Sequence, residues 1–297
     1  MIKYYDRRTG KYETERVAGG HWLNWLYTSA LGKGVLELFI KKKIASRLYG
    51  AYCDRAGSRK KIQKFIRELE IDMSGFEVPA EGFKTFNEFF YRALKEEGAD
   101  FGCETDIFPA PCEGKLLAFE NIDICKLIQV KGLTYSLAEL LGGETLSADY
   151  EEGVCLIFRL NPANYHRFHF VDRGVCSPAS EIKGWYYSVN PISLQSMEKV
   201  FCANKREWSI LHSENFGDVL YVEVGATFVG SIVQTYRPLD EVQRGGEKGY
   251  FKFGGSTVIL FLKKNIVAID RDILEQSALE IESCVKLGEK IGVRLGS

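Results

Sequence analysis

Short runs of β-branched and aromatic residues, bounded by Gly, Asn or Asp, recur along this chain from residue 108 onward. They occupy residues 115–119, 127–130, 154–160, 219–224 and 257–262. Runs of this length and composition are typical of strands. Residues 135–141 are predicted to form a short helical interruption, and residues 273–291 a mixed segment with one helix through Leu274, Leu279 and Ile281. The larger part of the chain is therefore predicted to be a β-rich body.

The first 75 residues have a different character. Apolar residues recur at helical spacing between residues 36 and 52, and Ser58 is the predicted N-cap of a further helix. Residues 33–67 hold eleven basic and two acidic residues, hence a net charge of +9, and Trp22 and Trp25 precede them. Such a region can lie on an anionic lipid surface. The alternative is a helical subdomain that packs its apolar stripe on the core and leaves its basic face in water.

A linker with Gly and Pro follows, around Ser74-Gly75 and Val78-Pro79. Thr85 and Glu88 then form a predicted capping box at the start of a helix. We therefore predict an α+β fold with a helical N-terminal region, residues 1–75, followed by a β-rich mixed-sheet catalytic body, residues 76–297.

Several classes of protein are excluded by composition and charge. The net charge of −1 argues against a nucleic-acid partner. The polar start lacks the apolar core of a signal peptide, and no run of about 18 apolar residues exists to cross a membrane. None of the eight cysteines is spaced as CxxC, so we expect free buried thiols in a reducing compartment. These features predict a cytoplasmic location.

Two of the four histidines, His166 and His169, stand three residues apart after Asn161-Pro162-Ala163-Asn164. This spacing places them near each other on a helix, or on opposite faces of a strand. Histidine carries protons near neutral pH, so the pair is a candidate for acid–base catalysis as well as for a structural role. A two-histidine metal site lacks an evident third ligand, and no metal is predicted.

A Gly-Ser turn at Gly255-Ser256 precedes the last apolar run. The simpler interpretation is a glycine turn between strands. The alternative is self-cleavage, since glycine lets a hydroxyl approach its carbonyl closely. Attack of Ser256 on the Gly255 carbonyl, elimination of the ester to dehydroalanine and loss of ammonia would leave a pyruvoyl group at a new N-terminus. That chemistry needs a base and an electrophilic carbonyl.

Taken together, these segments resemble the phosphatidylserine decarboxylase family along nearly the whole chain. The matching segments are FGGST at 253–257, YHRFH at 165–169, FNEFFYR at 86–92, VNP at 189–191 and GATFVGSI at 225–232. The double glycine is similar to the GGST branch of that family rather than the LGST branch.

The resemblance implies a role for each matched residue. Ser256 would be the self-cleavage nucleophile and become the covalent pyruvoyl cofactor. Gly255 would end a β chain, residues 1–255, and the α chain would be 256–297. His169 would belong to the Asp-His-Ser processing triad and His166 would be the acid or base of decarboxylation, although the two assignments could be reversed.

One residue departs from the family pattern. The family's triad aspartate lies in a PxDG-type motif, and this chain has Pro111-Cys112-Glu113-Gly114. Glu113 keeps the carboxylate but adds a methylene, which can displace its oxygen by about 1 Å, and a misplacement of that size can cost roughly 100-fold in rate. We therefore expect slow or adjusted processing rather than its loss.

The reaction implied by the resemblance is conversion of phosphatidylserine to phosphatidylethanolamine and carbon dioxide, at the cytoplasmic side of the cell membrane as a peripheral protein. Expected partners are a membrane phospholipid substrate, an anionic membrane surface and the two chains of one precursor. The sequence leaves open a homo-oligomer and the acyl-chain preference. The alternatives are a pyruvoyl decarboxylase of a free amino acid and a membrane-binding relative that never cleaves.

Overall fold

The structure is a computed structural model that describes residues 2–15, 25–35, 43–95, 99–130, 133–226 and 231–296. Some of the sequence predictions lie outside these residues: those on Trp22, on the apolar positions Leu36, Phe39 and Ile40, and on 227–230 of the GATFVGSI segment.

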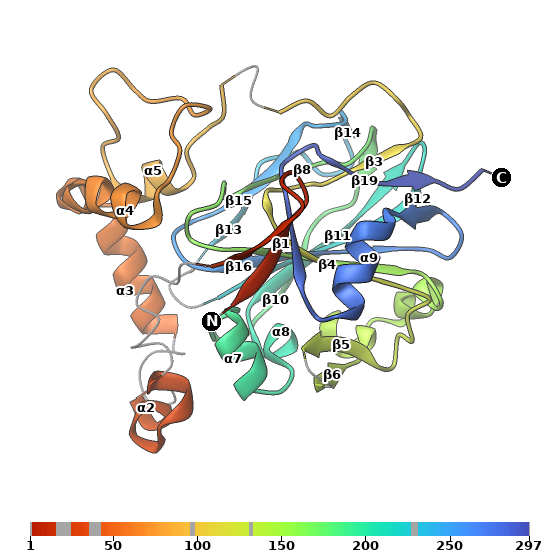
Figure 1. Cartoon of the computed structure of the whole chain (residues 1–297), viewed down its shortest axis with the longest axis horizontal. Helices are drawn as coiled ribbons and strands as arrows, with labels where there is room; N and C mark the ends of the chain where they lie inside the picture. Colours follow the sequence, from red (N-terminus) through yellow and green to blue (C-terminus); the bar gives the residue numbers. More distant parts are fainter. Residues whose placement is uncertain are drawn as a thin grey trace.

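A large mixed sheet forms the centre of the described body (Figure 1). Its strand order is β14-β9-β11-β12-β16-β7-β4-β18-β1-β2, with β10 paired to β11. The strands are β1 (Lys3–Asp6), β2 (Lys11–Thr14), β4 (Gly114–Glu120), β7 (Val154–Leu160), β9 (Gly174–Cys176), β10 (Ser180–Ile182), β11 (Arg206–Ser213), β12 (Gly217–Gly225), β14 (Glu241–Val242), β16 (Ser256–Leu262) and β18 (Glu282–Val285).

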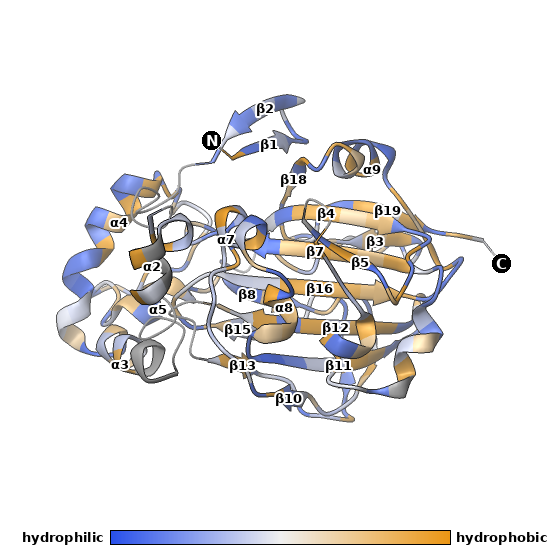
Figure 2. Ribbon diagram, turned by 90° about the horizontal axis from the view of Figure 1, so that it is seen from below, coloured by the Kyte–Doolittle hydropathy of each residue, from blue (hydrophilic) through white to orange (hydrophobic). Residues whose placement is uncertain are grey.

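Both faces of the central strands are apolar, because neither face meets water. β7 and β16 are buried at every position, and Figure 2 shows the hydrophobic colour along β4, β7, β16 and β12. One face packs on two small sheets, β13 (Ile232–Gln234)–β15 (Glu247–Phe251)–β8 (Arg167–His169) and β17 (Val267–Ile269)–β19 (Lys290–Arg294)–β3 (Ile107–Pro109). The other face is covered by β5 (Leu127–Val130), β6 (Leu133–Tyr135), α6 (Leu137–Leu140), α7 (Pro191–Ser196) and α8 (Val200–Ala203).

The remaining helices lie at the edges of the body. Those before residue 91 are α2 (Ala30–Val35), α3 (Lys43–Cys53), the 3-10 helix η2 (Ala56–Lys61), α4 (Ile62–Leu69) and α5 (Phe86–Phe90). The short 3-10 helix η3 (Thr145–Tyr150) and α9 (Arg271–Ala278) follow later in the chain. The helices from α2 to α5 stand beside one end of the sheet (Figure 1). The predicted α+β fold with a β-rich body is confirmed.

The two predicted helix caps had different outcomes. Thr85 is the N-cap of α5 as predicted, and its hydroxyl accepts a hydrogen bond from the Glu88 amide at 3.1 Å. The predicted capping box is not completed, because the Glu88 carboxylate accepts from the Lys84 amide instead of that of Thr85. The prediction for Ser58 was wrong: Ser58 lies inside η2, and α4 begins at Ile62. The Ser58 hydroxyl instead accepts a hydrogen bond from the amide of Phe86, so it joins η2 to the start of α5.

The first strands belong to the sheet of the body rather than to the helices that follow them. β1 pairs in parallel with β18 and antiparallel with β2. Just after β2, Glu15 makes a buried ion pair with Arg159 of β7, which also pairs with Glu282 of β18. A division of the chain at residue 75 stays a prediction, although residues 3–14 lie within the body's sheet.

Candidate active site

Ser256 is the first residue of β16, between Leu160 of β7 and Gly225 of β12. Its side chain is fully buried. The chain reaches it through Gly254, whose φ of 139° is a conformation that a residue with a Cβ rarely adopts, and then through Gly255. The glycines therefore allow a sharp approach to a strand that is fixed on both sides.

The ring of His166 lies against this serine. Its Nδ1 is 3.3 Å from the Ser256 Oγ, and its Nε2 is 3.0 Å from the carbonyl oxygen of Asn161. A carbonyl oxygen only accepts hydrogen bonds, so the ring proton is on Nε2 and the lone pair of Nδ1 faces the serine hydroxyl. Phe90 stacks on the imidazole with ring centroids 3.9 Å apart. The arrangement is that of a nucleophile with an oriented base.

Burial lowers the pKa of His166 from its usual 6.5 to about 3, and the nearby positive charge of Arg92 adds to this. Desolvation and a like charge both disfavour the imidazolium. The ring is therefore neutral near pH 7, which is the form that can take a proton from Ser256.

His169 is placed differently from His166. Its Nδ1 donates to the Gly245 carbonyl at 2.9 Å, and its Nε2 accepts from the hydroxyl of Tyr165 at 3.2 Å. Burial lowers its pKa too. Both ring nitrogens are thus occupied by other partners, and the structure brings His166, not His169, into contact with Ser256.

Glu113 reaches His166 through two asparagines rather than directly. Its Oε1 accepts from the side-chain amide of Asn164 at 2.8 Å and from Lys286 at 3.0 Å. The Asn164 Oδ1 accepts from the backbone amide of Asn161 at 2.9 Å, and the Asn161 carbonyl accepts from His166. These bonds form a continuous path from the Glu113 carboxylate to the Ser256 hydroxyl.

Sequence reasoning did not assign roles to four residues around this path: Asn161, Asn164, Phe90 and Arg92. The asparagines could have been suspected, since they flank the turn just before the paired histidines. Arg92 is fully buried, donates to the Ala163 carbonyl at 3.1 Å and lies 4.1 Å from the centre of the Phe76 ring. Burial lowers its pKa to about 10, so it stays cationic near pH 7.

A polar cavity of about 1250 Å³ ends at the loop that carries these asparagines. Its walls include Arg92, Glu113, Asn164 and Lys286. Ser256 and His166 are buried beyond this loop. The uncut chain therefore keeps the reactive pair away from water while the carboxylate end of the path faces the cavity.

The described ranges contain neither a metal-binding cluster nor a membrane-spanning helix. No group of three or more His, Cys, Asp or Glu side chains is arranged there to hold a metal ion. None of the helices in those ranges is both long and apolar enough to pass through a bilayer. All eight cysteines fall within the described ranges and are free, as predicted. The prediction that they are buried holds for four of them, because Cys202 and Cys284 are half-buried and Cys103 and Cys125 are exposed.

Comparison with known proteins gives a consistent result. Residues 86–293 match the family model described as phosphatidylserine decarboxylase. The chain is 53% identical over 294 residues to a phosphatidylserine decarboxylase proenzyme of Clostridium botulinum (strain Hall), covering 99% of this chain and 100% of that protein. It is 54% identical to proteins of the same name from Clostridium novyi, covering 99% and 100% of the two chains, and Clostridium perfringens, covering 98% and 99%.

Proposed function

Because the chain belongs to the phosphatidylserine decarboxylase family, we propose that it cuts itself between Gly255 and Ser256 and then converts phosphatidylserine to phosphatidylethanolamine and carbon dioxide. The enzyme is a lyase made as a proenzyme. The observation that carries the self-cleavage part of the proposal is the contact between the Ser256 hydroxyl and the unprotonated nitrogen of His166.

In the proposed cut, His166 takes the hydroxyl proton through Nδ1 while Oγ bonds to the Gly255 carbonyl carbon. The Gly255–Ser256 amide breaks as His166 passes that proton to the Ser256 nitrogen, which becomes a free amine, and an ester to the serine oxygen replaces the amide. Loss of the Cα proton and breakage of the Cβ–Oγ bond then release the Gly255 carboxylate and leave dehydroalanine. Water converts that residue to a pyruvoyl group and ammonia, so every atom is accounted for.

The residues present fit a pyruvoyl group at position 256. The site offers a buried serine at the start of a fixed strand, an oriented base and a glycine turn just before the serine. When formed, the group supplies a carbonyl that can accept the electron pair released as carbon dioxide departs. His166, already beside residue 256, would return a proton to the reacting carbon, while Phe90 keeps its ring in place.

The strand order supports two chains that stay together after the cut. β16 lies between β12 and β7, and β18 lies between β4 and β1, so residues 256–297 are interleaved with strands of residues 1–255. Separating the chains would break these ladders on both sides of each strand. We therefore propose a mature enzyme of interleaved α and β chains.

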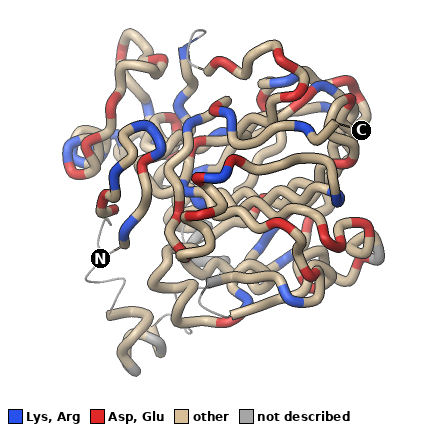
Figure 3. The backbone as a smooth tube through the Cα atoms, turned by 45° about the vertical axis from the view of Figure 1, so that its right-hand side comes forward, with Lys and Arg blue, Asp and Glu red and all other residues tan. Residues whose placement is uncertain are grey.

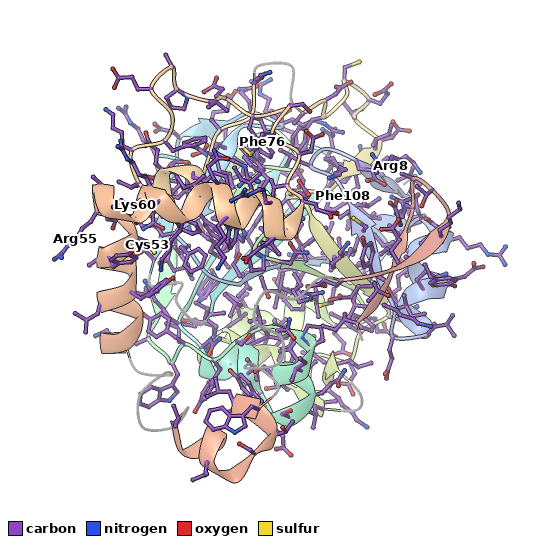
Figure 4. All side chains as sticks on the ribbon, turned by 60° about the vertical axis from the view of Figure 1, so that its left-hand side comes forward. Arg8, Cys53, Arg55, Lys60, Phe76 and Phe108 are labelled. Carbon is purple, nitrogen blue, oxygen red and sulfur yellow. The ribbon has the colours of Figure 1, made fainter. Side chains whose placement is uncertain are left out.

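We also propose that residues 25–35 and 43–69 rest on an anionic membrane at its cytoplasmic side. Large apolar side chains are exposed there, namely Trp25, Leu31, Leu48 and Tyr52. The side chain of Arg55 extends away from the body (Figure 4). The body itself carries charged residues of both signs (Figure 3). Exposed apolar side chains among basic residues suit the interface of an anionic bilayer.

Glu113 is proposed to act on His166 by holding the loop of Asn161 and Asn164. Glu113→Gln keeps an oxygen that can accept from Asn164, so we expect self-cleavage to slow by less than about threefold. Glu113→Ala removes the acceptor, and we expect roughly tenfold slower cleavage, because the loop is less fixed. The measurement is the fraction of cut chain against time, by intact mass spectrometry.

The magnitude distinguishes this role from a direct one. Where a carboxylate holds the catalytic histidine itself, loss of its charge costs about 10,000-fold. A loss of that size in Glu113→Gln would show that the carboxylate contacts a histidine during the reaction.

The activity is tested with the freshly purified chain and vesicles that contain phosphatidylserine. We expect phosphatidylethanolamine and carbon dioxide in equal amounts, and no carbon dioxide from free serine. Turnover of free serine instead would favour the amino-acid alternative. A single uncut chain with no lipid turnover would favour a relative that never cleaves.

A further inference from the structure

The residues just before the proposed cut are fixed by three consecutive backbone amides. The Phe251 amide donates to the His166 carbonyl at 2.9 Å, and the Lys252 amide donates to the Ser231 carbonyl at 3.2 Å. The Phe253 amide donates at 2.9 Å to the side-chain oxygen of Asn87. Since Ser256 is fixed in its strand, only the two glycines between Phe253 and Ser256 remain outside these contacts.

The third of these contacts comes from a side chain, and that side chain is itself held. Asn87 is fully buried in α5, and its amide nitrogen donates to Asp54 at 2.8 Å and more weakly to the Gly50 carbonyl at 3.4 Å. Asp54 follows α3 and also pairs with Lys252 at 3.3 Å. The amide group of Asn87 is therefore oriented with its oxygen toward Phe253, because its nitrogen is held by a carboxylate.

The same helix contacts the base. Phe90 of α5 stacks on His166, and the Phe253 ring packs edge-on against both Phe86 and Phe90 with centroids 4.9 Å apart in each case. α5 thus contacts both the imidazole and the turn that carries the reacting carbonyl. A shift of this helix would move both partners relative to Ser256.

We propose that Asn87, oriented by Asp54, is a positioning residue for self-cleavage: it fixes the Phe253 amide and so places the Gly255 carbonyl for attack by Ser256. This inference rests on the proposed self-cleavage and adds residues that act before the cut. After the cut the Gly255 end is no longer the reacting group, so Asn87 is not needed for decarboxylation itself.

An exchange of the two side chains tests the orientation. Asn87→Asp faces a second carboxylate and loses the donor to Asp54, so we expect cleavage to slow by about tenfold or more. Asp54→Asn alone still accepts from Asn87, and the partly exposed pair with Lys252 contributes little, so its cleavage stays within about threefold of wild type. In the double variant the amide of residue 54 donates to the carboxylate of residue 87, so the hydrogen bond is restored in the opposite direction. Its cleavage should return to the rate of Asp54→Asn.

Three readouts are taken on the full-length chain: the half-time of cleavage, the thermal midpoint of unfolding, and decarboxylation per cut chain. For Asn87→Asp we expect the half-time of cleavage to lengthen, while decarboxylation per cut chain stays within about threefold of wild type. Wild-type cleavage by Asn87→Asp, or slow cleavage that Asp54→Asn does not restore, would overturn the inference. A wild-type chain that never cuts would instead overturn the proposed function, so the two failures are distinguishable.

Discussion

Replacing Ser256 with alanine should leave a single chain of 33.6 kDa that never forms phosphatidylethanolamine. The hydroxyl is the only group lost. In the proposed cut its oxygen attacks the Gly255 carbonyl and then leaves with the Gly255 carboxylate, so neither the ester nor the dehydroalanine can form without it. Because the site is fully buried and the removed atom is small, the fold should survive. Intact mass spectrometry of wild type and variant, with lipid turnover beside it, measures the effect.

A buried serine elsewhere supplies the matched control. Ser283 in β18 is also fully buried, and its hydroxyl has no hydrogen-bond partner in the described structure. Ser283→Ala should cut and turn over lipid as wild type does. If Ser256→Ala also gave two chains, with the smaller beginning at residue 256, the pyruvoyl mechanism would be excluded for this protein.

The strands were the part of the fold most open to prediction. The runs 127–130 and 154–160 match β5 and β7 at both ends, since their apolar residues are bounded by turn residues. Helix ends were less accurate. The predicted helix through Leu274 was extended to Leu279 and Ile281, but α9 ends at Ala278, and Glu280 follows with a positive φ of 58°. A single left-handed residue is a local choice that apolar spacing does not reveal.

Contacts between distant segments were beyond prediction. Ser58 has the residue type of a cap, but its hydroxyl bonds to a residue 28 positions later. Glu113 was assigned the position of the family's triad aspartate, and its link to His166 depends on how Asn161 and Asn164 fold their loop. The sequence could name Ser256, His166 and Glu113 as candidates, but the partner of each one is decided by the packing of separate strands.

The paired histidines show this most clearly, because the resemblance implies that His169 serves processing, whereas His166 is the one that contacts Ser256. His166→Ala should slow self-cleavage by about 100- to 10,000-fold, the usual contribution of a general base. His169→Ala loses bonds to Gly245 and Tyr165 but none to Ser256, so its cleavage should stay within about tenfold of wild type. Mass spectrometry follows both, and thermal unfolding shows whether each variant is folded.

The opposite result has a definite meaning. A folded His169→Ala that stays uncut, beside a His166→Ala that cuts but cannot decarboxylate, would return the roles that the family resemblance implies. It would also require His169 to leave Tyr165 and approach Ser256 before the reaction.

The pH dependence of wild-type cleavage tests, without a substitution, whether the base acts from a buried position. The pKa of about 3 keeps His166 unprotonated down to pH 5, because protonation requires a pH near or below the pKa. We therefore expect the cleavage rate to vary by less than about threefold between pH 8 and pH 5. A solvated histidine with a pKa near 6.5 would lose its base form about thirtyfold over that range. A decline of that size would mean that the base is exposed to water when it acts, which the burial of His166 does not allow.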